Sequence, residues 1–114
     1  MDIWSWVRDA REQLNEAGHE RLARLLGRLP GACCDDHHEQ VDAIYPEALA
    51  LTRSLKMPWL ELFTRHWNLQ SRILHRYEVA DWMGEAVSLI EFANREETRG
   101  CPQSVCVTQD LVTC

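Results

Sequence analysis

Apolar residues recur through most of the chain at the three- and four-residue steps that place side chains on one face of an α-helix. The first stripe lies within residues 2–17 and ends at Gly18; its members are Ile3, Val7, Ala10, Leu14 and Ala17. A second stripe runs up to Pro30 and Gly31, where we expect the helix to stop; its members are Leu22, Leu25, Leu26 and Leu29. The short connection between the two stripes predicts a helical hairpin.

A third helix is expected to open at Asp36, because Asp36 and Glu39 have the spacing of a capping box. Its apolar positions are Val41, Ile44, Tyr45, Ala48, Leu51 and Leu55. Pro46 lies inside this stretch, where it removes an amide donor and crowds the preceding turn. Either a kink near Tyr45 or a division into two shorter helices would accommodate it, and we favour the kink.

Pro58 suits the first position of a fourth helix. Two apolar rows follow, so we expect this helix to be buried on more than one side; the rows are Trp59, Leu62, Phe63, His66, Leu69 and Ile73, and Leu60, Trp67 and Leu74. Residues 79–98 predict a fifth helix. For residues 103–114 we favour a sixth helix over a strand, because the chain offers no second strand to pair with it. The pattern therefore predicts an all-α protein of about six helices.

Two segments, one around Glu47 and one around Glu85, match at an offset of 38 residues, a length typical of stacked helix pairs. Residues 67–98 also resemble a tetratricopeptide repeat. Residues at the packing positions of its first helix are Trp67, Ile73, Leu74 and Tyr77, those of its second helix are Ala86, Ile90 and Ala93, and Ala48, Thr52 and Leu55 repeat the second set one unit earlier. The departures from the family pattern are Gln70, Leu74 and Thr98. The resemblance implies a right-handed α-solenoid of antiparallel helix pairs whose first helices line a concave binding surface.

The length of 114 residues predicts one domain, residues 1–114. Because the apolar pattern continues to Cys114, we expect this domain to be the N-terminal part of a longer chain. A net charge of −6 argues against nucleic acid and anionic membranes as partners. No apolar run reaches the ~18–20 residues of a membrane span, and charged residues near the N-terminus stand where a secretory leader would need an apolar core, so we expect none. We therefore expect a cytoplasmic protein, in which the five cysteines are reduced thiols.

One polar row remains after the packing positions of the fourth helix are assigned. Its members share a helix face and are Asn68, Ser71, Arg72, His75 and Glu78. In the resemblance this face points into the concave groove, where an amide and a guanidinium suit a peptide backbone or a carboxylate. The alternative is a solvated face on which Arg72 and His75 stabilise the C-terminal end of the helix.

The segment from Cys33 to Glu39 holds every common type of zinc ligand, but only Cys34 and His38 have a spacing that lets two side chains converge. Helix initiation is the favoured interpretation of this segment. We find no catalytic motif and expect no cofactor. The sequence thus predicts a non-catalytic module that binds a protein or peptide. The alternatives are a small metal-binding enzyme or sensor that uses the Cys33–Glu39 cluster, and a self-associating structural domain that forms a homodimer.

Overall fold

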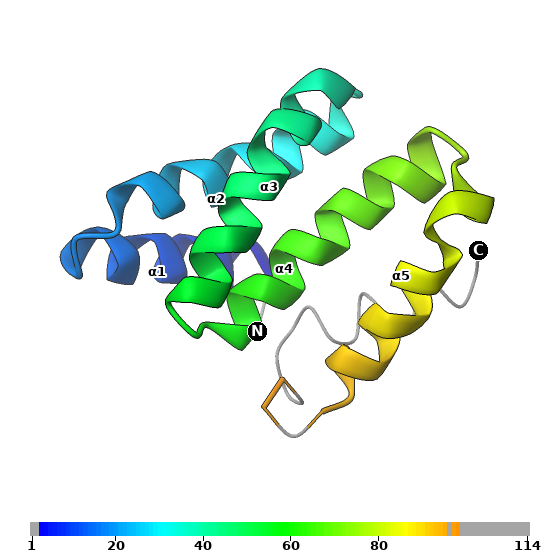
Figure 1. Cartoon of the computed structure of the whole chain (residues 1–114). Coiled ribbons are helices and arrows are strands. Elements are labelled where there is room, and N and C mark those ends of the chain that lie inside the picture. Colours follow the sequence, from blue (N-terminus) through cyan, green and yellow to red (C-terminus); the bar gives the residue numbers. More distant parts are fainter. Residues whose placement is uncertain (1–2, 96, 99–114) are drawn as a thin grey trace.

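The computed structural model describes residues 3–95 and 97–98, and within them the chain is helical without any β-strand. The helices are α1 (Ile3–Glu16), α2 (Glu20–Cys34), α3 (His38–Ser54), α4 (Pro58–Leu69), the π-helical η1 (Gln70–His75) and α5 (Val79–Ala93) (Figure 1). The all-α prediction is confirmed for this part of the chain. The helix predicted at 103–114 lies outside the described residues.

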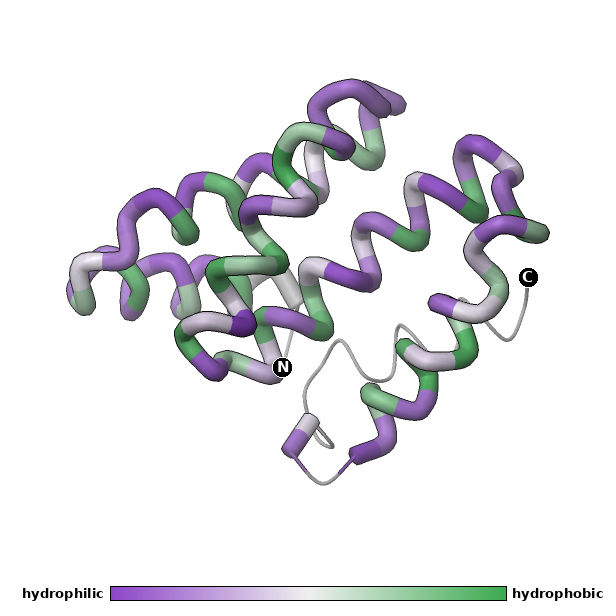
Figure 2. Tube along the Cα trace, in the orientation of Figure 1, coloured by the Kyte–Doolittle hydropathy of each residue, from purple (hydrophilic) through white to green (hydrophobic). Residues whose placement is uncertain are grey.

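Each helix packs mainly on the next one along the chain, and α2 also contacts α4 (Figure 1). The core is built mainly from α2, α3 and α4 and extends to buried residues of α1 and α5. Apolar positions recur along each of these helices (Figure 2). Its largest fully buried side chains include Leu22, Leu26, Leu29, Phe63 and Leu69. Helix α5 packs on α4 and η1, at the end of the stack.

Three of the helices end in the same type of hydrogen-bonded turn, the Schellman motif. Gly18, Asp36 and Lys56 adopt left-handed φ angles of 86°, 62° and 55° after α1, α2 and α3. Each donates its N–H to the carbonyl three residues earlier, and the next residue donates to the carbonyl five residues before itself. The predicted helix end at Gly18 is confirmed. The other two turns use residues that carry a Cβ in a conformation that favours glycine.

The helix boundaries differ from the sequence prediction at two places. Helix α2 continues through Pro30 to Cys34. The proline removes one backbone hydrogen bond, but the burial of Pro30, Ala32 and Cys33 in the core offsets this loss. The capping box at Asp36 and Glu39 is absent. Helix α3 begins at His38, its N-cap makes no side-chain hydrogen bond, and the Asp36 carboxylate is bonded to the His38 ring instead.

Helix α3 passes through Pro46 as one helix, so the division into two shorter helices does not occur, and Pro58 occupies the start of α4 as predicted. Helix α4, however, changes to a π-helix at Gln70. Trp67 and Ile73 are buried as the repeat resemblance implies, whereas Leu74 and Tyr77 are exposed. The wider π turn shifts the side chains that follow it, so the packing positions expected from α-helical spacing no longer face the core.

Candidate functional site

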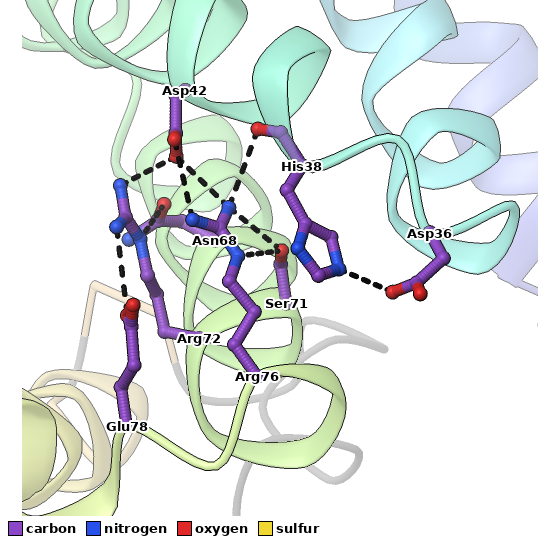
Figure 3. A network of polar contacts seen from close by, with 8 residues as sticks. All are labelled: Asp36, His38, Asp42, Asn68, Ser71, Arg72, Arg76 and Glu78. Atoms are coloured by element: carbon purple, nitrogen blue, oxygen red, sulfur yellow. Dashed lines mark hydrogen bonds and ion pairs between the residues drawn. The ribbon is translucent and has the colours of Figure 1, made fainter.

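Four residues of the predicted polar row lie on α4 and η1, and Glu78 follows as the N-cap of α5. Figure 3 shows Asn68, Ser71, Arg72 and Glu78 beside Asp42 of α3. Asn68 and Ser71 are fully buried. The side chains of Arg72, His75 and Glu78 keep 19%, 33% and 32% of their surface exposed. The structure therefore brings the five residues to one region, but only the last three have surface that a ligand in solution can touch.

Asp42 of α3 is the acceptor at the centre of this region (Figure 3). Its Oδ1 accepts from Arg72 Nη2 at 2.6 Å and from Arg76 Nη2 at 2.9 Å, and its Oδ2 accepts from Arg76 Nη1 at 3.2 Å. Arg76 Nη2 also donates to the backbone oxygen of His38 at 3.3 Å. Two guanidinium groups of the fourth-helix segment thus share one carboxylate of α3, which ties the two helices together.

Arg72 extends the same network toward α5. Its Nε lies 3.5 Å from Asn68 Oδ1, its Nη1 lies 3.5 Å from Glu78 Oε2, and its Cζ lies 4.8 Å from the centre of the Trp82 ring. The guanidinium is therefore held by a carboxylate on each side and by an aromatic face. Arg72 connects α3, α4 and the beginning of α5.

The π-helix accounts for the pairing of Ser71 with Arg76. The Arg76 N–H donates to the Ser71 carbonyl at 3.1 Å, and the Arg76 Nε and Nη2 donate to Ser71 Oγ at 3.3 Å and 3.1 Å. A separation of five residues places both groups on one side of a π turn, whereas an α-helix would not align them. Asn68 Nδ2, one turn earlier, is buried and makes no hydrogen bond.

The charges in this network balance within the protein. The hydrogen bond from Arg76 and the nearby positive charges lower the pKa of the Asp42 carboxyl below its ordinary value. The hydrogen bond from His38 likewise lowers the pKa of Asp36. Arg72 and Arg76 face Asp42 and Glu78, so a ligand carboxylate would have to displace an internal partner before it could pair with either arginine.

Sequence reasoning missed Asp42 and Arg76. Arg76 follows Arg72 by four residues, a spacing that places both on one helix face in the sequence pattern. Asp42 lies 30 residues before Arg72 and contacts it only because α3 packs on α4. No short-range pattern encodes that contact. The sequence pattern therefore predicts the polar row but not Asp42, the carboxylate that pairs with its arginine.

The Cys33–Glu39 segment covers the last two residues of α2, the turn that follows and the first two residues of α3. Burial raises the pKa of the Cys33 thiol to about 12, while Cys34 is exposed. His38 bonds Asp36, and His75 Nδ1 lies 3.9 Å from the same carboxylate. Over the described part of the chain, no three His, Cys, Asp or Glu side chains are placed to hold a metal ion.

Several exposed apolar side chains lie on α5, the last helix among the described residues. Val79, Met83 and Val87 of α5 are 37%, 47% and 50% exposed. Their spacing of four residues puts them on one side of the helix, which we call the α5 face. A separate apolar hollow of about 430 Å³ lies between α1 and the start of α4, with Leu14 and Trp59 among its lining residues.

Comparison of the chain with protein-family models, curated proteins and solved structures finds no match. Among the helices that the structure describes, none has the length and apolar character needed to cross a membrane.

Proposed function

We propose that this chain is a non-catalytic helical-repeat module that binds a protein or peptide. The observation that carries the proposal is the α5 face, a row of large apolar side chains left exposed on an ordered helix. Exposed apolar surface of this kind marks interaction sites in folded proteins, because leaving it in water costs free energy that a partner can recover.

The order of the helices supports the repeat arrangement. Helix α4 begins 38 residues after α2, which equals the offset between the matching segments in the sequence. The apolar residues Leu22, Leu25 and Leu29 of α2 and their counterparts at that offset, Leu60, Phe63 and Trp67, are all buried. This agreement favours two successive helix pairs, α2–α3 and α4–α5, stacked as in the tetratricopeptide-like solenoid that the resemblance implies.

The polar row takes a supporting part in this proposal. Asn68 and Ser71 are buried, and Asp42 already neutralises Arg72, so the row is better suited to hold the two helix pairs together than to capture a ligand. Arg72, His75 and Glu78 keep part of their surface exposed, but each already has an internal partner that a ligand would have to displace. We do not propose a metal-dependent activity for the Cys33–Glu39 segment, because among the described residues no three His, Cys, Asp or Glu side chains lie together as a set of metal ligands.

Peptide display tests the proposed function. The full chain, immobilised through a C-terminal tag, is panned against a library of random peptides about 16 residues long, and enriched peptides are titrated by fluorescence anisotropy. We expect enrichment of sequences that bind with micromolar dissociation constants. A chain that is folded by circular dichroism but enriches nothing above an unrelated helical protein would overturn the proposal.

A further inference from the structure

Three arginines on the first two helices differ from the rest in having no carboxylate partner. Among the residues that the structure describes, every other arginine forms an ion pair with an aspartate or glutamate, from Arg8 on α1 to Arg95 after α5. The exceptions are Arg11, Arg24 and Arg28, and all three are exposed. Because the chain holds 18 acidic and 12 basic residues, a shortage of carboxylates does not explain them.

Gly27 brings these three side chains together where α1 and α2 lie side by side (Figure 1). Arg11 reaches from α1 onto α2, and its Nε donates to the backbone oxygen of Ala23 at 3.2 Å. A Cβ added at Gly27 would lie 2.6 Å from Arg11 Cζ, so the guanidinium occupies the place of a side chain at residue 27. Residues three and four apart on a helix are neighbours, with Cβ atoms ~5–6 Å apart. The Arg11 guanidinium therefore lies beside Arg24, which neighbours Arg28.

We call these three residues the arginine cluster; without an anion, their arrangement costs stability. Arg24 and Arg28 are like charges four residues apart, and the glycine between them weakens the middle of α2. Arg11 adds a third positive charge. Glu20, one turn before Arg24, and Glu12, next to Arg11, form no ion pair with the cluster in the described part of the chain. Its guanidinium groups are therefore free to pair with carboxylates from solution.

The surface beside the arginine cluster is open. Gly31 follows Arg28 by three residues, is exposed, and would meet nothing within 4 Å if it carried a Cβ. A polypeptide can therefore lie against α2 at this point. The net charge of −6 opposes the approach of anions, but the Debye length is only ~8 Å at physiological salt. A short ligand seated on the cluster thus interacts mainly with the three arginines.

We infer that Arg11, Arg24 and Arg28 bind a short acidic segment of another protein, whose aspartate or glutamate carboxylates accept paired hydrogen bonds from the guanidinium groups. A nucleic acid or a membrane is disfavoured, because its phosphates extend beyond the cluster to surfaces where this chain is negative. The inference rests on the proposed function and adds to the α5 face a second surface, with the chemistry of the segment that it takes.

Two short fluorescein-labelled peptides test the inference. Every second residue is glutamate in the first peptide and glutamine in the second, and glycine or serine fills the other positions. Each is titrated with the full chain at about 0.15 M salt and followed by fluorescence anisotropy. We expect the glutamate peptide to bind at least about tenfold more tightly than the glutamine peptide, with a preference that falls as salt is added.

Two double variants with the same change in net charge locate the binding. Arg24→Gln with Arg28→Gln removes two charges from the cluster and should weaken the glutamate peptide at least about tenfold. Arg53→Gln with Arg95→Gln removes two charges from exposed arginines that already have carboxylate partners. This control should change the affinity less than about twofold, because screening limits the effect of distant charges.

Gly27→Ala tests the position of Arg11 without removing any charge. The added Cβ displaces the Arg11 guanidinium, so the glutamate peptide should bind about three- to fivefold more weakly. The melting temperature should stay the same or rise, since alanine is the better helix former and the flexible arginine can move away. When Arg11→Gln is already present, Gly27→Ala should have no further effect on the affinity.

Several outcomes would overturn the inference. Equal affinity for the two peptides would do so, and so would equal losses in the two double variants, which would indicate a general effect of charge. Tighter binding of oligothymidine or of phosphatidylserine vesicles, lost in Arg24→Gln with Arg28→Gln, would assign the cluster to nucleic acid or a membrane. A large fall in melting temperature on that double change would assign it to the fold. Peptides enriched by display that bind this variant normally would still support the proposed function, so the two failures are distinguishable.

Discussion

Asp42 carries the contact between α3 and the fourth-helix segment, since it accepts hydrogen bonds from both Arg72 and Arg76. We predict that Asp42→Asn lowers the free energy of unfolding by about 1 kcal/mol at pH 7. This is below the ~1.5–3 kcal/mol of a hydrogen bond to a charged group, because solvent screens a carboxylate that is 43% exposed. Urea unfolding followed by circular dichroism measures the difference, with Glu12→Gln on exposed α1 as the control.

The stabilising effect of Asp42 depends on pH, and the pKa shift gives the direction. The arginines lower the pKa of Asp42 in the folded state, so its stabilising effect is complete above the unfolded value of about 3.9 and is lost as the pH falls through the folded value. The stability difference between the parent and Asp42→Asn should therefore shrink toward zero below about pH 3. A difference that stays constant down to that pH would show that the ion pair is not its source.

Lys56 determines how α3 gives way to α4. It holds a φ of 55° at a turn that closes with two backbone hydrogen bonds, and its side chain is exposed. A residue with a Cβ pays about 1–2 kcal/mol in this conformation, whereas glycine does not. Replacing Lys56 by glycine relieves this strain, but part of the stabilisation is lost because glycine gives the unfolded chain more conformational freedom. We predict that Lys56→Gly raises the free energy of unfolding by about 0.5–1 kcal/mol.

Lys56→Ala is the matched control for this element. It removes the same charge and the same long side chain but keeps the Cβ, so it should leave the stability within about 0.5 kcal/mol of the parent. Thermal and urea unfolding of the three proteins measure both changes. If alanine stabilises as much as glycine, the effect comes from the lysine side chain and the strain at this turn plays no part.

Helix α5 offers two small residues with opposite surroundings. Ala86 is buried against the stack, and Gly84 lies in open space. We predict that Ala86→Leu overpacks the contact with the stack and costs about 1–3 kcal/mol. Gly84→Ala should instead stabilise by about 0.5–1 kcal/mol, since it only improves helix propensity. Melting temperatures that move in opposite directions check both; no loss for Ala86→Leu would argue against the packed helix pair.

The apolar periodicity predicted the helices well, because each helix carries its own apolar stripe at steps of three and four residues along the sequence. It failed where the deciding interaction is not local. Pro30 reads as a stop, yet α2 continues, because the buried turn after the proline compensates for one lost hydrogen bond. Asp36 and Glu39 read as a capping box, but the turn geometry places Asp36 outside the helix start. The π turn at Gln70 has no recognisable signal in one sequence.

The same distinction applies to the candidate site. The polar row on the fourth helix followed from spacing alone, but Asp42, which accepts hydrogen bonds from Arg72 and Arg76, belongs to another helix. The exposure of the α5 face could not be predicted from the sequence for a similar reason. Val79, Met83 and Val87 look like core positions until the fold shows that the stack covers only the neighbouring side of α5.

At the scale of the whole molecule, α5 packs on α4 and η1 among the described helices, and one buried arginine helps to hold it there. Arg65 of α4 donates to Glu85 at 2.9 Å, to Ser88 at 3.3 Å and to Glu61 at 3.3 Å. Its Cζ also lies 5.2 Å from the centre of the Phe92 ring. Removal of one partner from a fully buried ion pair costs about 3–5 kcal/mol, and the cost is smaller here because the Glu85 side chain left behind is 31% exposed to solvent.

We therefore predict that Arg65→Met detaches α5 before the rest of the molecule opens. Amide hydrogen exchange followed by mass spectrometry should accelerate strongly in Val79–Ala93 and much less in Glu20–Cys34, which packs on α1, α3 and α4. Adding Glu85→Gln to Arg65→Met should restore part of the protection, because it removes the uncompensated carboxylate. Equal acceleration in both helices would mean that the chain opens as one cooperative unit. The α5 face would then be carried by the whole stack, and a partner bound to it would stabilise α2 as much as α5.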